Sequence, residues 1–186
     1  VVNLEALVKE MEEIAKHFGI DPHEYLRISG NAHLILPKHI QESIDDKIGS
    51  TGKGIAPAYT SKYDKSGLRM NDLINIMSPD KEDTRNLESS REYLERFQGL
   101  ATLIVDSSVL LNNALDKGKN VLFEGAQGTG LDIDFGEYPF VTSSNPTAGG
   151  ACTGTGVPPT RIDKVLGVAK AYVTRVDRDG KGPLVT

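Results

Sequence analysis

Two glycine-rich loops, each following a short apolar run, limit the folds open to this chain more than any other feature. Residues 121–123 are apolar and lead into a loop, 124–130, that contains three glycines. Residues 140–141 lead in the same way into 142–150, which holds two threonines, two serines and two further glycines. A strand followed by a small, hydroxyl-rich loop is how an α/β sheet presents backbone N–H groups to a phosphate. The pattern therefore predicts two strands and a site for a nucleotide-type ligand.

The charge of the chain argues against a nucleic-acid partner. The 186 residues carry 21 Lys and Arg against 26 Asp and Glu, a net charge of -5, whereas binding to a nucleic acid needs clustered basic residues. A single phosphorylated metabolite needs only one or two cations. The lone cysteine, Cys152, and the absence of a signal peptide or a long apolar run predict a cytoplasmic protein without a membrane partner.

Helical periodicity alternates with short apolar runs along the chain. A first helix is predicted at 4–18, between Asn3 and Gly19, and a second starts at Pro22 after Asp21. Further helices are predicted at 57–62, from 71–72 onward, and at 94–115 with a break near 106–107. The predicted strands cover 26–28, 32–36, 121–123, 140–141 and 165–176. Long helices between short buried strands indicate an α/β fold with a mainly parallel sheet and flanking helices. We expect a single domain over 1–186 with a mainly helical excursion over 70–118.

A third glycine-rich loop, 48–56, contains Ser50, Thr51 and Lys53 among its three glycines. Its spacing excludes a Walker-type loop for nucleoside triphosphates, because that motif places four residues between its first glycine and Gly-Lys-Ser/Thr. Flexible glycines with two hydroxyls and one lysine can still enclose a single phosphate. An ordinary surface loop explains the composition equally well, so the residues alone leave both alternatives open.

Two pairs of residues suggest a metal site at first sight. His33 and His39 flank the predicted strand 32–36, but no Cys or carboxylate lies at ligand spacing, which favours core and surface histidines. Asp132 and Asp134 share one side of an extended segment, yet no other oxygen ligand nearby completes a cation shell. We therefore interpret the aspartates as turn and hydrogen-bonding residues and predict no metal ligands in this chain.

Uncharged polar side chains in the loops are the candidates for ligand binding. Gln127, set between glycines, can donate to a developing oxyanion and accept from a ring N–H without adding charge. The hydroxyls of Thr51, Thr129 and Thr142 can each donate to a phosphate oxygen. Such hydroxyls more often satisfy the local backbone, so these residues by themselves do not identify the ligand.

Several stretches of the chain resemble one enzyme family in both residues and order. They are ISGNAHLILP at 28–37, GSTGKGIAPAY at 49–59, 110–115, FEGAQGT at 123–129, LDIDFG at 131–136, 138–139, VTSSN at 141–145, 170–172 and 174–176. These stretches extend through almost the whole chain, which makes chance agreement very improbable. On these motifs, the chain resembles the adenylosuccinate synthetase family.

The resemblance implies a P-loop-NTPase-like synthetase fold, here incomplete, and a GTP-dependent ligase of AMP biosynthesis. Members of the family join IMP and L-aspartate, using GTP and Mg²⁺. The purine 6-oxygen is phosphorylated, and the amino group of aspartate then displaces the phosphate to give adenylosuccinate. The implied partners are IMP and a second subunit in a homodimer.

By position, three of the candidate residues match family residues that contact IMP. Gln127 matches the glutamine that hydrogen-bonds the purine and stabilises the 6-oxyanion, while Thr51 and Thr142 match threonines that hold the 5′-phosphate. Lys65 stands where the family usually has an arginine that reaches the IMP phosphate of the partner subunit. Lysine keeps the charge there but loses the planar fork. The supporting loop residues are Gly52, Gly125, Gly128 and Thr129.

Other functional parts of the family do not occur among the 186 residues. These are the GDEGKGK loop, whose aspartate is the base and binds magnesium, the histidine acid, the aspartate-binding loop and the guanine pocket. The resemblance therefore implies the central portion of the enzyme, carrying the IMP-side loops and inactive alone. The alternative is a non-catalytic module that binds a nucleotide or phosphate with the same loops.

Overall fold

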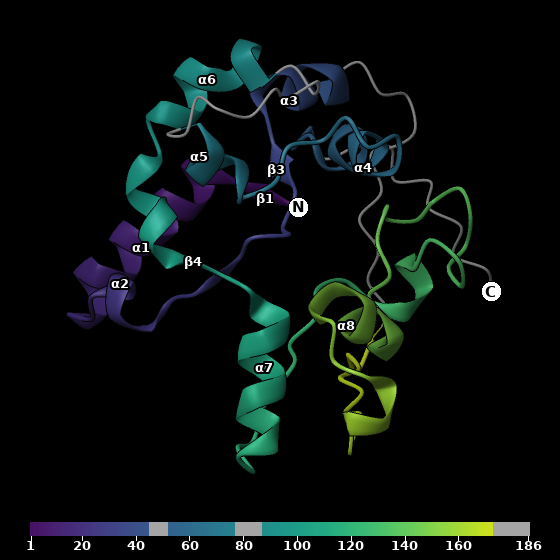
Figure 1. Cartoon of the computed structure of the whole chain (residues 1–186). Helices are drawn as coiled ribbons and strands as arrows, with labels where there is room; N and C mark the ends of the chain where they lie inside the picture. Colours follow the sequence, from purple (N-terminus) through teal and green to yellow (C-terminus); the bar gives the residue numbers. More distant parts are fainter. Residues whose placement is uncertain (45–51, 77–86, 173–186) are drawn as a thin grey trace.

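The computed structural model describes residues 1–44, 52–76 and 87–172 (Figure 1). In chain order the elements are β1 (Val2–Asn3), α1 (Leu4–Phe18), α2 (Pro22–Tyr25), β2 (Ile28–Ser29), β3 (Leu34–Ile35), α3 (Pro37–Ile44), α4 (Ile55–Tyr63), α5 (Asp72–Asn75), α6 (Leu87–Glu95), β4 (Ile104–Val105), α7 (Ser107–Asp116) and α8 (Ala148–Thr155). Three short 3-10 helices are η1 (Gln98–Leu103), η2 (Thr129–Leu131) and η3 (Pro159–Arg161). The predicted α/β class is confirmed.

The four named strands of the described part of the chain form two short parallel sheets, and an isolated antiparallel bridge joins His33 to Arg69. β1 pairs with β3, with Val2 opposite Leu34. β2 pairs with β4, with Ile28 opposite Ile104. The partners in each pair are far apart in sequence because a parallel pair needs a crossover connection, here made of helices. The predicted parallel arrangement is confirmed, and each of these sheets has two strands.

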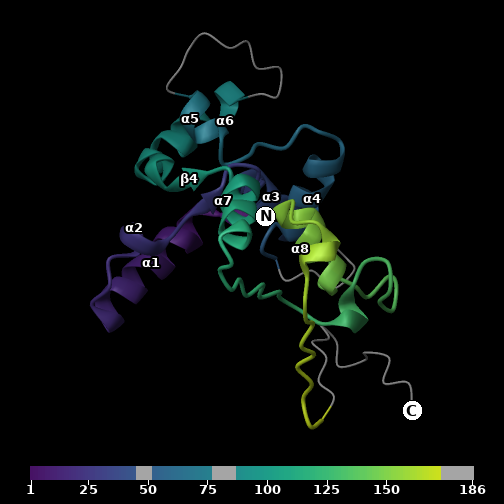
Figure 2. The same ribbon diagram turned by 60° about the horizontal axis from the view of Figure 1, so that its bottom comes forward.

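The main hydrophobic core lies among the elements before α7. Its buried residues come from α1, β2, residues 34–36 in and after β3, the 68–76 segment, α6, and residues 97–103 at η1. They are Leu4, Met11, Ile28, Leu34, Leu36, Leu68, Met70, Leu73, Ile76, Leu94, Phe97, Leu100 and Leu103. Figures 1 and 2 show α7 and α8 side by side, and Figure 1 shows both of them below the elements that contribute to this core. The chain therefore has a packed first part, joined through β4 to a second part built of α7, α8 and loops.

Several helix ends follow directly from local sequence. The Asn3 side chain accepts from the N–H of Ala6 at 3.0 Å, and Gly19 closes α1 in the left-handed region at φ 65°. Asp21 caps α2, with Pro22 in the first turn. Asp106 caps α7, which explains the predicted break within 94–115. That segment forms the end of α6, η1, β4 and α7 instead of one helix.

The strands predicted at 121–123, 140–141 and 165–176 are wrong wherever the structure describes them. These segments have no regular secondary structure through residue 172, and residues 173–176 lie outside the described part of the chain. An apolar run becomes a strand only when a neighbouring strand completes its hydrogen bonds. The described strands pair elsewhere, and the side chains of Leu122 and Val168 stay 83% and 98% exposed.

Within the ranges 1–44, 52–76 and 87–172, none of the helices has the length and apolar character needed to cross a bilayer. The longest, α1, has 15 residues, and acidic and basic residues occur along it.

Candidate functional site

The segment that joins the two predicted ligand loops folds around the buried carboxylate of Asp132. Its Oδ1 accepts from the backbone N–H groups of Asp134 at 2.9 Å and Phe135 at 3.3 Å. The same oxygen accepts from Nδ2 of Asn145 at 3.1 Å, while Oδ2 accepts from the N–H of Thr147 at 3.4 Å. One side chain thus ties the segment directly after the first loop to the second loop, 142–150.

These hydrogen bonds also determine the charge of the carboxyl group. Burial alone raises the pKa of Asp132, because it penalises the charged form. The backbone donors of Asp134, Phe135 and Thr147 and the amide of Asn145 outweigh that effect and hold the pKa below its usual value. Asp132 is therefore ionised at neutral pH, which strengthens each hydrogen bond that it accepts.

Backbone hydrogen bonds also join the segment after the first loop to the second loop. The N–H of Thr142 donates to the carbonyl of Leu131 at 2.8 Å, and the N–H of Ile133 donates to that of Ser144 at 3.2 Å. Gly136 fits tightly at the turn, since an added Cβ would lie 2.4 Å from the carbonyl oxygen of Asp132. The paired loops form one compact unit, in which the predicted hydrogen-bonding role of the aspartates is confirmed.

Gln127 has an unusual backbone conformation at the start of this unit. Its φ is 66°, in the left-handed region that side-chain-bearing residues rarely adopt, and the residue is exposed. Strained backbone often accumulates at functional sites. Gly125, Gly128 and Thr129 are exposed around it, and Thr142 is half-buried on the facing loop. The structure therefore brings the two loops that carry Gln127 and Thr142 into one surface unit.

The other predicted ligand residues lie at the two ends of α4. Gly52 precedes α4 with φ 68°, and Lys65 follows it, exposed, with φ 69°. Thr51 lies outside the described residues. Figures 1 and 2 draw α4 on the side of the molecule that carries α8 and the loop before it. Within the described residues, no hydrogen bond joins Lys65 to the unit around Asp132.

Both histidines that flank β3 are buried and hydrogen-bonded to protein atoms. His33 Nε2 accepts from Nε of Arg69 at 3.5 Å, and His39 contacts Leu36 and Ser61. Within the described ranges, no three His, Cys, Asp or Glu side chains are grouped so as to hold a metal ion. The two histidines thus belong to the packing around β3.

We expect stability to fall as the pH is lowered from 6.5 towards 4 because of His33. Burial, followed by the positive charges of Arg69 and Lys62, lowers the pKa of His33 from 6.5 to about 4. Between these values the unfolded chain binds a proton that the folded chain does not, so acid favours unfolding. Urea unfolding midpoints across this pH range would measure the slope. His33→Gln should make the slope shallower, leaving the part due to His39, whose pKa burial also lowers. The exposed control His17→Gln should leave the slope unchanged, and an unchanged slope in His33→Gln would contradict the assignment.

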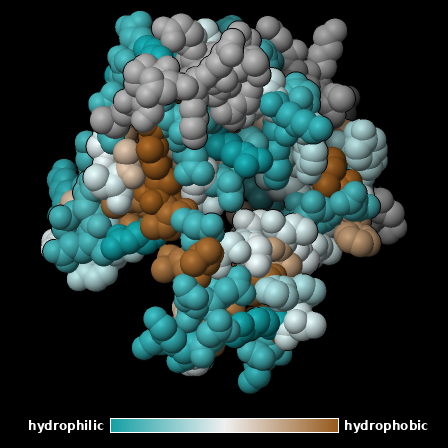
Figure 3. Space-filling view, in the orientation of Figure 1, coloured by the Kyte–Doolittle hydropathy of each residue, from teal (hydrophilic) through white to brown (hydrophobic). Residues whose placement is uncertain are grey.

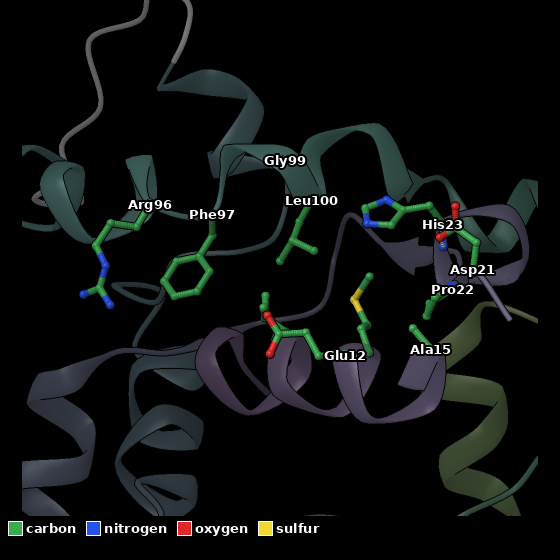
Figure 4. Close-up of a pocket in the computed structure, with 11 residues that line it drawn as sticks. Glu12, Ala15, Asp21, Pro22, His23, Arg96, Phe97, Gly99 and Leu100 are labelled. Carbon is green, nitrogen blue, oxygen red and sulfur yellow. Dashed lines mark hydrogen bonds between the residues drawn. The ribbon is translucent and has the colours of Figure 1, made fainter. Parts of the chain in front are cut away.

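A groove that the sequence did not predict lies between α1 and η1 (Figure 4). Its volume is about 370 Å³. Phe97 and Leu100 point into it from one side, Glu12 faces them from α1, and Arg96 lies at one end. Figure 3 shows a brown, apolar strip on this side of the molecule, over the region of η1 and β4. The amphipathic pattern of α1 predicted a packed helix, and the groove marks where that packing is incomplete.

Comparisons with known proteins converge on one family. The family model described as adenylosuccinate synthetase matches residues 1–186. An adenylosuccinate synthetase from Salinibacter ruber is 46% identical over 216 residues, and one from Streptococcus gordonii is 48% identical over 212. Each alignment covers 100% of this chain and 48% of the relative, so the chain spans about half the length of the curated relatives that it matches.

Two solved structures are similar in fold. The fully ligated adenylosuccinate synthetase from Plasmodium falciparum has a TM-score of 0.79 and 30% identity, covering 95% of this chain and 46% of that chain. The cyanophage S-2L succinoaminodeoxyadenylate synthetase, bound to dGMP and dATP, has a TM-score of 0.57 and 19% identity, covering 85% of this chain and 39% of that chain. The second likeness supports the fold alone.

Proposed function

This chain belongs to the adenylosuccinate synthetase family, and we propose that it supplies the IMP-binding wall of the enzyme that joins IMP to L-aspartate. The observation that carries the proposal is the unit around Asp132, which fastens the segment directly after the Gln127 loop to the loop that carries Thr142. The proposed context is AMP biosynthesis in the cytoplasm. The chain alone is proposed to bind IMP without forming product, since it spans about half of its relatives.

The purine end of IMP is assigned to Gln127. Its exposed position and left-handed backbone place a neutral amide at the surface of the unit. An amide donor can stabilise negative charge that develops on the purine 6-oxygen without carrying a charge of its own. The glycines on both sides of this loop leave room for the flat ring to approach the backbone.

The phosphate end is assigned to Thr142 on the facing loop, with Thr51, Gly52 and Lys65 from the region of α4. A hydroxyl and an ammonium group are suited to phosphate oxygens. In the proposed homodimer, Lys65 reaches the IMP phosphate of the partner subunit. Lysine makes a single-pronged contact where an arginine would give two parallel hydrogen bonds.

GTP and Mg²⁺ are proposed as requirements of the whole enzyme, and no residue of this chain is assigned to bind them. The described residues contain no group of metal ligands, so we derive no step through the metal from this chain. What these residues can do is bind IMP, orient its purine and neutralise part of its phosphate charge. Holding a substrate in a reactive orientation is itself a large part of catalysis in phosphoryl transfer.

IMP binding to the 186-residue chain is the direct test of the proposal. We expect calorimetry to detect one site, weakened by Gln127→Ala and by Thr142→Ala. Loss of a hydrogen bond to a charged phosphate should weaken binding roughly tenfold to a hundredfold in Thr142→Ala. The matched control is Thr153→Ala on α8, whose hydroxyl donates only to the carbonyl of Gly150 in its own helix. Equal affinity in all four proteins would place IMP elsewhere.

A further inference from the structure

Two buried polar side chains project from α3 towards α4. His39 and Ser43 are four residues apart, so they lie on the same face of the helix. Each side chain is about 1% exposed, although both are polar. A polar group is stable in such a place only when its hydrogen bonds are satisfied. Their partners therefore show what the two residues do.

Ser43 holds the beginning of α4. Its Oγ donates to the carbonyl of Ile40 at 2.8 Å and accepts from the N–H of Gly54 at 3.0 Å. Gly54 has φ 74°, and an added Cβ would lie 2.9 Å from the backbone of His39 and Ile40 and from Cγ2 of Ile35. The backbone at the start of α4 is thus pressed against α3 and fastened to it by one hydroxyl.

His39 holds the other end of α4. Its Nδ1 accepts from the N–H of Leu36 at 3.1 Å, so the ring proton sits on Nε2, which donates to Oγ of Ser61 at 3.2 Å. Burial lowers the pKa of His39 and keeps the ring neutral, as the contact with Leu36 requires. The carbonyl of Ser61 in turn accepts from the N–H of Gly67 at 2.8 Å. This chain of contacts reaches the turn 64–67, which carries Lys65.

We propose that His39 and Ser43 are positioning residues that set the orientation of α4 and so place Lys65 for the phosphate of IMP. The proposal rests on the function proposed above and extends it to residues that do not touch the ligand. One helix, α3, fastens α4 through the N–H of Gly54 at its start and through the hydroxyl of Ser61 near its end. Two fixed points determine the direction of a helix, whereas one would leave it free to swing.

Two substitutions at position 39 distinguish the hydrogen bond that the ring makes to Leu36 from the one that it makes to Ser61. Asn at position 39 keeps an acceptor for Leu36 but is too short to reach Ser61, whereas Gln places an amide donor near Ser61. Without ligand, hydrogen exchange at the amide of Gly67 should be about tenfold faster in His39→Asn and close to unsubstituted in His39→Gln. Ser43→Ala should have the same effect at Gly54. The control Thr60→Ala, an exposed hydroxyl on α4 that donates to Ala56, should change neither amide.

Calorimetry with IMP on the same proteins completes the test. We expect the dissociation constant to rise about fivefold to tenfold in His39→Asn and in Ser43→Ala, with His39→Gln recovering most of the affinity. Adding Ser61→Ala to His39→Asn should cause no further loss, because both substitutions remove the same contact. Unchanged exchange at Gly67 and Gly54 would overturn the positioning role even if IMP binds. Absence of IMP binding by the unsubstituted chain would instead contradict the proposed function, and with it the assignment of Lys65.

Discussion

Replacing Asp132 with Ala is expected to abolish measurable IMP binding while the core before α7 stays folded. The substitution removes the acceptor for the N–H groups of Asp134, Phe135 and Thr147 and for the amide of Asn145. Two of these donors lie in the segment that follows the first ligand loop and two lie in the second loop, so their loss detaches that segment from the second loop. Several charge-assisted hydrogen bonds disappear together, so we expect IMP affinity to fall by more than about a hundredfold.

A graded substitution and a control make this result interpretable. Asp132→Asn keeps one oxygen for the donors of Asp134 and Phe135 but presents an NH₂ group to the N–H of Thr147, so its loss should be smaller. Asp163→Ala removes an exposed carboxylate on the same half of the chain and should leave IMP binding unchanged. Amide chemical shifts should move throughout 130–147 in Asp132→Ala. Unaltered IMP affinity in that variant would show that the loops do not need the carboxylate.

Replacing Gly54 with Ala is expected to destabilise the protein by about 3 kcal/mol. A left-handed alanine costs roughly 1–2 kcal/mol, and the new methyl group adds an overpacking cost of about 1–3 kcal/mol. That methyl group would lie 2.9 Å from backbone atoms of α3, which cannot move aside as a flexible side chain can. Urea unfolding followed by circular dichroism would measure the free energy of unfolding.

Alanine substitutions at two other glycines distinguish the free-energy cost of a left-handed backbone from the cost of steric overlap. Gly52 has φ 68° but open space around its added Cβ, so Gly52→Ala should cost only the backbone part, about 1–2 kcal/mol. Gly99 has neither a positive φ nor a close neighbour, so Gly99→Ala should be nearly neutral. An equal cost at Gly54 and Gly52 would mean that α3 and α4 are not in close contact.

Features controlled by neighbouring residues were predictable from the sequence. The caps at Asn3 and Asp21 and the end of α1 at Gly19 depend on contacts within a few residues. The strand predicted at 32–36 is present as β3, Leu34–Ile35. Its partner, β1, lies more than thirty residues earlier, which no local pattern identifies.

The strand predictions near 121–123 and 165–172 failed for the same physical reason. Apolar residues indicated burial, but burial and hydrogen bonding depend on what lies beside the segment. In the described part of the chain these segments have no strand partner. Leu122 and Leu166 are consequently 83% and 82% exposed.

The sequence predicted which loops form the candidate site, but it did not predict the contacts that hold them in place. Glycines and hydroxyls marked the loops of Gln127 and Thr142, and the family resemblance implied IMP as their ligand. The central position of Asp132 depends on Asn145 and Thr147, thirteen and fifteen residues away. The sequence assigned it a hydrogen-bonding role, but only the folded loops show which donors meet there. The same holds for Ser43 and Gly54, which are eleven residues apart.

Titration of the ¹⁵N-labelled chain with IMP, followed by amide chemical shifts, tests the central claim most directly. We predict saturable shifts concentrated at 125–130 and 142–147, with smaller shifts at the turn that carries Lys65. The same titration of Asp132→Ala should lose the shifts in both loops. Absence of shifts at saturating IMP, or shifts confined to the groove between α1 and η1, would contradict the assignment of this surface to IMP.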